Sequence, residues 1–240
     1  MNFDLNCDLG EGEPRARTAA LMRAITSGNV ACGGHAGSVA SMRSCVRLAN
    51  RFGVRLGAHP GWRDTTGFGR AECDVTANDL ELILLQQVSA LERIAREQRV
   101  PLHHVKLHGE LYHSAESDPV LARRYAETVA REWPQAKIFA RVGGRVAAAA
   151  RRKGVVVWPE AFLDRGYRDD GTLVPRRERG ALLTTARQVL ARLRRLQGAG
   201  AISSVSGKLL RVRARTLCLH SDTPHAIRLA EAVARCLARA

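Results

Sequence analysis

The chain has 240 residues, of which 45% are hydrophobic, 25% charged and 5% aromatic. These proportions are typical of a globular protein and exclude a collagen-like repeat, a coiled coil or a largely disordered chain. The 38 Lys and Arg residues against 23 Asp and Glu give a formal net charge of +15, and only four of the basic residues are Lys. Residues 121–240 carry this excess, with 25 basic and 9 acidic residues, which raises the question of a nucleic-acid or membrane surface.

No stretch of the sequence approaches 18 uninterrupted apolar residues, so we expect no transmembrane helix. The first residues, MNFDLNCDLGEGEP, are acidic and polar, unlike a secretory signal peptide. The six Cys are scattered without a C-x-x-C pair, which argues against a cysteine-based zinc site and against a disulfide framework. These observations predict a cytoplasmic protein.

Short apolar runs alternate with longer amphipathic stretches along the chain. Strands and helices are expected, in chain order, as strand 2–6, helix 16–26, strand 29–32, helix 39–52, strand 54–57, helix 77–98, strand 102–107, helix 119–132, strand 137–140, helix 144–152, strand 155–158, helix 184–197, a short hairpin over 201–212, strand 216–219 and helix 224–238. This alternation predicts parallel strands with right-handed crossovers. About seven such units fit a (β/α) barrel better than an open sheet. No composition break marks a second domain, so one domain over residues 1–240 is expected.

Polar residues follow almost every predicted strand. In chain order they are Asn6, Asp8 and Glu11; His35; His59; Lys106 and His108; Glu160, Asp164 and Arg165; and His220 and Asp222. In a barrel these strand ends meet at one face, where catalysis takes place in such folds. Several His, carboxylates and a Lys in one cleft are suited to general acid–base chemistry.

Each of these residues also has an ordinary structural interpretation. A single His after a strand is more often a hydrogen-bonded packing residue, but four at equivalent positions favour a functional cluster. Asn6 could form a turn, Asp222 could cap the last helix, and Arg165 could pair with Asp164 or Glu160. His103, His104 and His225 are expected on helices or at strand starts, outside the cluster. A divalent metal held by His35, His59 and His220 is a further alternative.

Standard phosphate-binding motifs are absent from the sequence. Ser206-Gly207-Lys208-Leu209 resembles the end of a phosphate loop, but Ile202 stands where the earlier Gly is required and no Ser or Thr follows the Lys. If the chain handles ATP, it does so without this cradle.

Six segments resemble the LamB/YcsF family in their order and approximate spacing. They are DLNCDLGEGE, SGNVACGGHAG, GVRLGAHPGWRDTTGFGR, LHHVKLHGELYH, PEAFLDRGYRDDGTLVPR and TLCLHSDTP, and they span almost the whole chain. The resemblance implies a distorted, TIM-like barrel of seven strands, distantly similar to the glycoside hydrolase/deacetylase barrels. It also implies the A subunit of a 5-oxoprolinase, which converts 5-oxo-L-proline to L-glutamate with ATP as co-substrate, Mg²⁺ accompanying the ATP, and partner subunits B and C.

The sequence departs from the family pattern at several positions. The family generally reads GFHAGD around His35, so Gly34 and Ser38 replace an aromatic residue and a carboxylate, and Glu110 is new in the segment after His108. These changes leave the identity of the substrate open.

The resemblance and the residues together give a set of expected roles. Asp8 or Glu11 is expected as the base, His59 and His108 as acid–base partners, and Lys106 as the group that stabilises negative charge. The residues expected to bind the small-molecule substrate are Asn6, His35, Glu160, Arg165, His220 and Asp222, with Arg165 on its carboxylate. The alternatives are a metal-dependent carbohydrate deacetylase or hydrolase and a non-catalytic binding subunit. No nucleic-acid or membrane partner is expected, because the basic residues of the second half spread over most of its elements.

Overall fold

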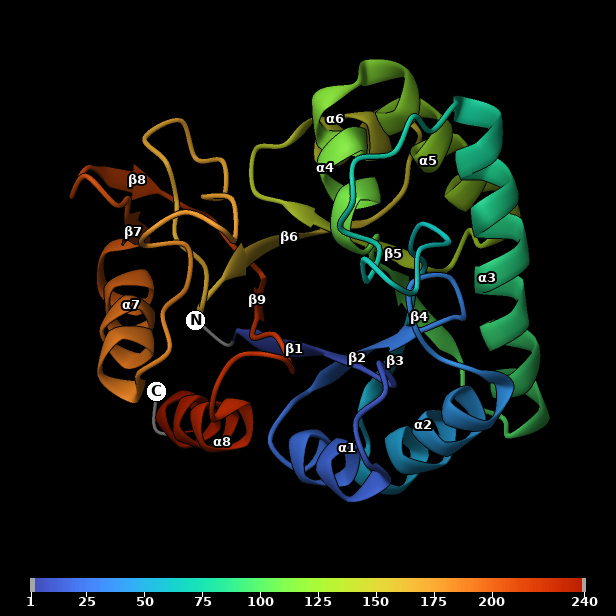
Figure 1. Ribbon diagram of the computed structural model, residues 1–240, viewed down its shortest axis with the longest axis horizontal. Helices are drawn as coiled ribbons and strands as arrows, with labels where there is room; N and C mark the ends of the chain where they lie inside the picture. Colours follow the sequence, from blue (N-terminus) through green and yellow to red (C-terminus); the bar gives the residue numbers. More distant parts are fainter. Residues whose placement is uncertain (1–2, 239–240) are drawn as a thin grey trace.

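Seven parallel strands form a closed barrel with helices around its outside (Figure 1). The computed structural model describes residues 3–238. The barrel strands are β1 (Asp4–Leu9), β2 (Ser27–Ala31), β3 (Arg55–His59), β4 (Leu102–Val105), β5 (Lys137–Arg141), β6 (Val157–Phe162) and β9 (Thr216–Cys218). The helices are α1 (Arg15–Met22), α2 (Val39–Phe52), α3 (Ala77–Glu97), α4 (Gly109–Ser117), α5 (Pro119–Glu132), α6 (Arg145–Arg152), α7 (Ala186–Ala199) and α8 (Ala226–Leu237).

The short strand β9 closes the barrel. Thr216 is in register with Asp4 of β1 on one side and with Glu160 of β6 on the other. Between β6 and β9 the chain forms a long loop, α7 and an antiparallel hairpin of β7 (Ala201–Ser203) and β8 (Leu209–Arg211) outside the barrel. The expected seven-stranded TIM-like barrel and the expected hairpin are therefore confirmed.

Several expected element boundaries differ from the observed ones by one to four residues. The first strand ends at Leu9 rather than at residue 6, and the sixth at Phe162 rather than at residue 158, so Asp8 and Glu160 lie within strands instead of after them. Helix α1 ends at Met22 rather than at residue 26, because Thr26 already hydrogen-bonds to Leu5 of β1 and leads into β2. Helix α4, directly after the fourth strand, was not expected, since the segment from His108 carries site residues and little helical periodicity. The first strand begins at Asp4, and residue 2 of its expected range lies outside the described residues.

Side-chain caps fix where the longer helices begin. The Thr76 hydroxyl accepts from the backbone N–H of Asp79 at the start of α3, and the Asp79 carboxylate accepts in return from the Thr76 backbone, which is a capping box. Ser38 and Ser41 do the same for α2, which is capped at its other end by Gly53 with a φ of +67°. The buried residues of α2 recur at helical spacing, at Met42, Cys45, Val46 and Ala49, and face the barrel.

The interior of the barrel contains buried polar residues along β1. Strand β1, DLNCDL, is buried along its whole length. Its apolar residues Leu5, Cys7 and Leu9 belong to the hydrophobic core, whereas Asn6 and Asp8 alternate with them and meet polar groups of other strands across the barrel. A strand buried on both faces usually reads as a continuous apolar run. This departure indicates a polar barrel interior. Among the described residues, no helix is both long and apolar enough to cross a membrane.

Candidate active site

A pocket of about 760 Å³ opens at the carboxyl end of the barrel strands. Its floor and walls come from the ends of β1, β3, β4, β6 and β9, from α4, and from the loops around residues 70 and 175. The charged and His residues that line it are Asp8, His59, Arg70, Glu72, Lys106, His108, Glu110, His113, Arg165, Arg176, Arg177 and His220. The volume is in the range of small-molecule sites.

Lys106 occupies the centre of the floor. Its ammonium lies 3.0 Å from Glu160 Oε1 and 3.2 Å from Asp8 Oδ1, and it donates to Asn6 Oδ1 at 3.3 Å. The Sγ atom of Cys218 is 3.1 Å away. Burial disfavours the charge on Lys106, but the two carboxylates and Cys218 outweigh it and raise its pKa well above the usual value. The floor therefore presents a fixed positive charge next to the Asp8 carboxylate.

Asp8 is held by neighbours that favour its ionised form. The Asn29 amide donates to Asp8 Oδ1 at 2.8 Å, and His59 Nε2 is 3.5 Å from the same oxygen. Although burial opposes ionisation, His59 and Lys106 hold the pKa of Asp8 well below its usual range. Asp8 is therefore available as a proton acceptor at neutral pH.

Glu11, His35, His59 and His108, which we call the imidazole cluster, lie beside Asp8. His35 Nε2 is 3.1 Å from Glu11 Oε1, and His108 Nδ1 is 3.0 Å from His59 Nε2. The rings of His35 and His108 stack with centroids 3.6 Å apart. Burial, with Asp8 and Asp222 nearby, raises the pKa of Glu11 well above its usual range. Burial, together with His59, lowers the pKa of His35 to about 3.

Asp164 and His220 form a second pair, after the ends of β6 and β9, in which Asp164 is fully buried and His220 partly so. His220 Nδ1 lies 3.0 Å from Asp164 Oδ1, while the His220 backbone N–H and the Thr223 hydroxyl donate to Asp164 Oδ2 at 2.9 and 2.6 Å. Burial opposes ionisation of Asp164, but His220 and these hydrogen bonds lower its pKa to about 2. The carboxylate thus fixes the His220 ring with its Nδ1 turned towards Asp164, and His220 lines the pocket.

Arg165 is a buried cation without a carboxylate partner among residues 3–238. Its guanidinium donates to the backbone carbonyls of Val174 at 2.7 Å and Ala181 at 3.4 Å, so it pairs with neither Asp164 nor Glu160. Burial, with Arg176 close by, lowers its pKa to about 10, at which it is still charged at neutral pH. A buried, uncompensated charge is unfavourable, and an anionic ligand in the pocket would offset it.

The residues expected at the site occupy three positions. Asp8, His59, Lys106, His108, Arg165 and His220 line the pocket. Asn6 and Glu160 lie beneath Lys106, and the Asn6 amide donates a hydrogen bond to Glu160 at 3.0 Å. Glu11 and His35 lie behind His59 and His108. Asp222 is at the rim, where Arg70 donates to it at 2.7 Å and Arg176 at 3.2 Å. It does not cap α8, which begins after His225 without a side-chain cap.

Several residues of the site were not expected from the sequence. Asn29 donates to both Asn6 and Asp8, and His104, expected outside the cluster, is fully buried with Nε2 2.7 Å from Asn29 Oδ1. Arg70 and Arg176 come from loops far apart in the sequence. The alternation of polar residues in β1 was a usable signal for a polar barrel interior, and hence for an inward-facing Asn29. No comparable signal exists for the loop residues.

The departures from the family pattern lie in different surroundings. Ser38 is exposed and caps α2, a role that Asp also performs well. At Gly34, a Cβ atom would lie 2.2 Å from the Gly61 carbonyl and 2.5 Å from the Gln87 side chain, so Gln87 occupies the space next to this position. Glu110, by contrast, lines the pocket, and burial raises its pKa. Of the three, only Glu110 can contact a ligand in the pocket directly.

Comparison with known proteins agrees with this architecture. The model of the LamB/YcsF family matches residues 3–240. A lactam utilization protein from Thermus thermophilus is 36% identical, with a TM-score of 0.91 over 100% of this chain and 97% of that one. A putative cellobiose-phosphate cleavage protein from Enterococcus faecalis (TM-score 0.52, 10% identity, 98% and 89% covered) shares the fold alone. A truncated 3-deoxy-D-arabino-heptulosonate 7-phosphate synthase from Thermotoga maritima also shares only the fold, with a TM-score of 0.53 and 8% identity over 99% of this chain and 86% of that one. The match over nearly the whole chain and the identity to the Thermus protein mean that this chain belongs to the LamB/YcsF family.

Proposed function

We propose that the chain is the A subunit of an ATP-dependent 5-oxoprolinase, which opens the lactam ring of 5-oxo-L-proline to give L-glutamate and works with two partner subunits, B and C. Membership of the family supports this proposal, and so does the 36% identity to a protein described as acting in lactam utilization. The observation that carries it is the buried Arg165 facing a pocket that also holds the ionised Asp8.

Arg165 accounts for recognition of the substrate. At neutral pH, 5-oxo-L-proline carries one negative charge, on its carboxylate. Two donors of the Arg165 guanidinium are held by backbone carbonyls, which fixes its plane and leaves the rest of the group for the pocket. A bidentate contact to the carboxylate would orient the lactam ring towards Lys106 and Asp8.

Hydrolysis of an unstrained lactam needs activation, because the amide is stabilised by resonance. The lactam oxygen would take the γ-phosphoryl group of ATP, with release of ADP. One water then adds to the activated carbon and the ring C–N bond breaks, leaving γ-glutamyl phosphate. A second water releases inorganic phosphate and glutamate. The proposed base for the attacking water is Asp8, rather than Glu11, because Asp8 has the lowered pKa.

The leaving nitrogen needs a proton, and His220 is the proposed donor. Its Nδ1 faces Asp164 at 3.0 Å, so its Nε2 is the nitrogen left for the substrate. Lys106 would offset negative charge that develops on the reacting carbon's oxygens. The acid–base roles expected for His59 and His108 stay a prediction.

ATP, accompanied by Mg²⁺, is proposed to bind on subunits B and C or between them and this chain. The reason is that the sequence lacks a phosphate loop and a dinucleotide fingerprint. The pocket, at about 760 Å³, is larger than a 5-oxoproline molecule needs, which leaves room for the phosphoryl group of an activated intermediate.

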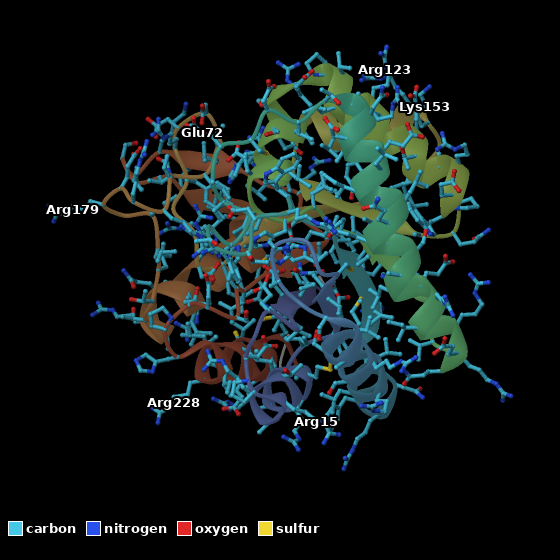
Figure 2. The ribbon with its side chains drawn as sticks, turned by 45° about the vertical axis from the view of Figure 1, so that its right-hand side comes forward. Arg15, Glu72, Arg123, Lys153, Arg179 and Arg228 are labelled. Atoms are coloured by element: carbon cyan, nitrogen blue, oxygen red, sulfur yellow. The ribbon has the colours of Figure 1, made fainter. Side chains whose placement is uncertain are left out.

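A coupled assay for glutamate tests the proposal, with and without subunits B and C and with and without ATP. We expect glutamate only when all components are present. Arg165→Ala should raise KM for 5-oxoproline by at least about tenfold, the equivalent of one lost charge-assisted contact. Arg179→Ala is the matched control, because Arg179 is exposed and points away from the molecule (Figure 2). His59→Ala and Lys106→Ala should each abolish turnover. No glutamate from the complete mixture would refute the proposal.

A metal-dependent carbohydrate deacetylase or hydrolase is the second candidate, favoured by the three His residues that converge beside the pocket. Release of acetate from an acetylated sugar by this chain alone would support it. If the chain binds the lactam, but the complex with subunits B and C keeps full glutamate-forming activity when the site residues of this chain are replaced, the chain is a non-catalytic binding subunit.

A further inference from the structure

The imidazole cluster brings four donor atoms to one point. Glu11, His35, His59 and His108 each offer one ligand atom, and these atoms lie within 4.8 Å of one another. The four residues follow or end four consecutive strands, β1 to β4, so the barrel itself fixes their spacing. All three imidazoles are buried.

The hydrogen bonds of His59 and His108 determine where their protons lie. His59 Nδ1 is 2.8 Å from the carbonyl of Lys106, and His108 Nε2 is 2.9 Å from the carbonyl of Phe68. A carbonyl only accepts, so both of these nitrogens carry hydrogen. The other two nitrogens, His59 Nε2 and His108 Nδ1, are then lone-pair acceptors in the neutral rings, yet they lie 3.0 Å apart. Two acceptors at this distance require a positive group between or beside them.

The distances suit a four-coordinate metal ion. Bonds of 2.0–2.1 Å in a tetrahedral site place neighbouring ligand atoms about 3.3 Å apart. The observed separations are 3.0 Å for His59–His108, 3.1 Å for His35–Glu11, 3.5 Å for His108–Glu11 and 4.0 Å for His59–Glu11. A shared proton would relieve only the contact between His59 and His108, whereas four atoms converge. Three imidazoles and a carboxylate favour Zn²⁺ and its transition-metal neighbours over Mg²⁺ or Ca²⁺.

The surroundings of the cluster resemble the outer shell of a metal site. Ligating His residues usually donate their second nitrogen to a carbonyl or carboxylate, as His59 and His108 do here. Phe68, whose carbonyl accepts from His108, has a φ of +56°, an unfavourable conformation for a residue other than Gly. His35 has no hydrogen bond at Nδ1 within the described residues and is oriented by stacking on His108.

We propose that Glu11, His35, His59 and His108 bind one divalent transition-metal ion, with Zn²⁺ as the best match to the donor set. Asp8 stays outside the ligand set, because Lys106 and Asn29 already hold the oxygen that lies 3.5 Å from His59. His59 and His108 then act as ligands instead of proton carriers, and Asp8 remains as the base. His108 and Glu11 replace His220 in the metal set expected from the sequence.

Metal binding by the chain alone tests this proposal independently of any enzymatic activity. Protein stripped with a chelator is titrated with Zn²⁺ by calorimetry and with Co²⁺ by visible absorption. We expect one equivalent per chain and Co²⁺ bands of the intensity seen for four-coordinate sites. Glu11→Gln and His108→Gln should each weaken Zn²⁺ binding by about 100-fold or more, since even second-shell changes cost 10- to 100-fold.

Two control variants locate the ion. His113→Gln alters an exposed His of the same pocket and should leave Zn²⁺ binding unchanged. His220→Gln alters the neighbouring Asp8–Cys218–His220 group, the other described set with metal-like spacing, and should also leave it unchanged. Loss of binding in His220→Gln but not in His108→Gln would overturn the assignment.

A measurement on the unmutated chain keeps the proposal testable if a variant fails to fold. With ¹⁵N-labelled His, the ring resonances of three residues should shift on addition of one equivalent of Zn²⁺. Absence of stoichiometric binding of both Zn²⁺ and Co²⁺, with no such shifts, would refute the ion and leave a shared proton between His59 and His108.

Discussion

Asp8 lies in β1 and Glu11 just after it, yet their environments shift the pKa values of the two carboxyl groups in opposite directions. Asp8 lies 3.2 Å from the Lys106 ammonium, and its pKa is lowered by His59 and Lys106 despite burial. Glu11 has no such cation at this distance, and burial with Asp8 and Asp222 nearby raises its pKa. Carboxyl groups whose pKa values are pushed apart commonly divide the acid and base roles of a site. The position of Lys106 is therefore the reason that Asp8, rather than Glu11, is the proposed base.

The Asp164–His220 pair gives a prediction about turnover. Asp164→Asn keeps the shape but replaces a carboxylate that fixes the His220 ring by an amide that favours the wrong tautomer. We expect kcat for glutamate formation with subunits B and C to fall by about 10²- to 10⁴-fold, with little change in KM. Thr223→Val is the control, because it removes another hydrogen bond to Asp164 and leaves His220 in place. Equal turnover in Asp164→Asn and the unmutated chain would exclude His220 as the proton donor.

Asp164 also makes stability depend on acidity. Its pKa is about 2 in the folded chain, below the value near 3.8 expected when unfolded, so ionisation stabilises the fold. This contribution is fully present above about pH 4 and is lost as the pH falls through about 2. A difference of nearly two pKa units corresponds to about 2 kcal/mol. Urea unfolding at pH 7 and pH 3 should show a smaller loss of unfolding free energy in Asp164→Asn than in the unmutated chain. An identical loss in both proteins would contradict this.

At the scale of elements, the loop between β3 and α3 supports one wall of the site. Gln87 of α3 accepts from the Gly61 N–H at 3.1 Å and donates to the Gly61 carbonyl at 2.8 Å. Further along, Glu110 N donates to the Gly69 carbonyl at 2.9 Å, and a Cβ atom on Gly109 would lie 2.2 Å from the same oxygen. The loop and the start of α4 thus pack so closely that only Gly fits between them.

The cap of α3 gives a prediction about stability. Thr76→Ala removes the hydroxyl that accepts from the Asp79 N–H and should lower the unfolding free energy by about 1 kcal/mol. Thr66→Ala is the control, since Thr66 is an exposed loop residue without a side-chain hydrogen bond among the described residues. Urea unfolding followed by circular dichroism measures both. If the two variants are equally stable, the capping box does not contribute as argued.

The order of most strands and helices was predictable from the sequence, whereas the contacts between these elements were predictable only in part. Helix α3 was recognisable because Thr76 precedes a long apolar stripe, and the strands because apolar runs recur between helices. Helix α4 was missed because its sequence, GELYHSAES, has weak apolar periodicity and depends on packing against α5 and α6. The site residues at strand ends followed from the barrel itself. His104 could not be assigned, because its orientation depends on the space that Gly57 leaves inside the barrel, where a Cβ atom would lie 2.0 Å from the imidazole.

At the scale of the whole molecule, the positive charge is distributed over the surface. The labelled side chains from the basic second half point outward in Figure 2, Arg123 and Lys153 together at the upper right, Arg179 at the left and Arg228 at the lower left. A net charge of +15 that is spread over the surface is suited to attracting and docking acidic partners. A nucleic-acid-binding protein would instead concentrate its basic residues on one face.

This distribution predicts how the proposed complex responds to salt. If subunits B and C dock on the basic surface, raising NaCl from about 0.05 to 0.5 M should increase the Kd of association at least about tenfold, because screening shortens the reach of exposed charges. Sucrose at matched osmolarity is the control for nonionic effects. A Kd that does not change with salt would indicate that these charges take no part in assembly.

We expect the amino end of the barrel to stabilise the fold and the carboxyl end to hold the proposed active site. Asp4 and Asp8, at the two ends of β1, test this expectation. Asp4 Oδ1 accepts from Thr26 at 2.5 Å, Ser27 at 2.7 Å and Arg55 at 2.9 Å. Its Oδ2 accepts from Thr216 at 2.5 Å. One carboxylate therefore joins β1 to the chain around β2, β3 and β9. Asp4→Asn turns one acceptor into a donor facing hydroxyl groups and should lower the unfolding free energy by about 1–3 kcal/mol. Turnover per folded molecule should persist, because the pocket lies at the opposite end of the strands.

Asp8 lies four residues further along β1. Asp8→Asn should abolish glutamate formation. The pair of variants is measured by urea unfolding and by the coupled assay with subunits B and C. If Asp4→Asn reduced turnover as strongly as Asp8→Asn while keeping normal stability, the amino end of the barrel would have to be part of the catalytic machinery. We expect the opposite, because every described hydrogen bond of the Asp4 side chain goes to strand residues or to Thr26, and none reaches a residue of the pocket.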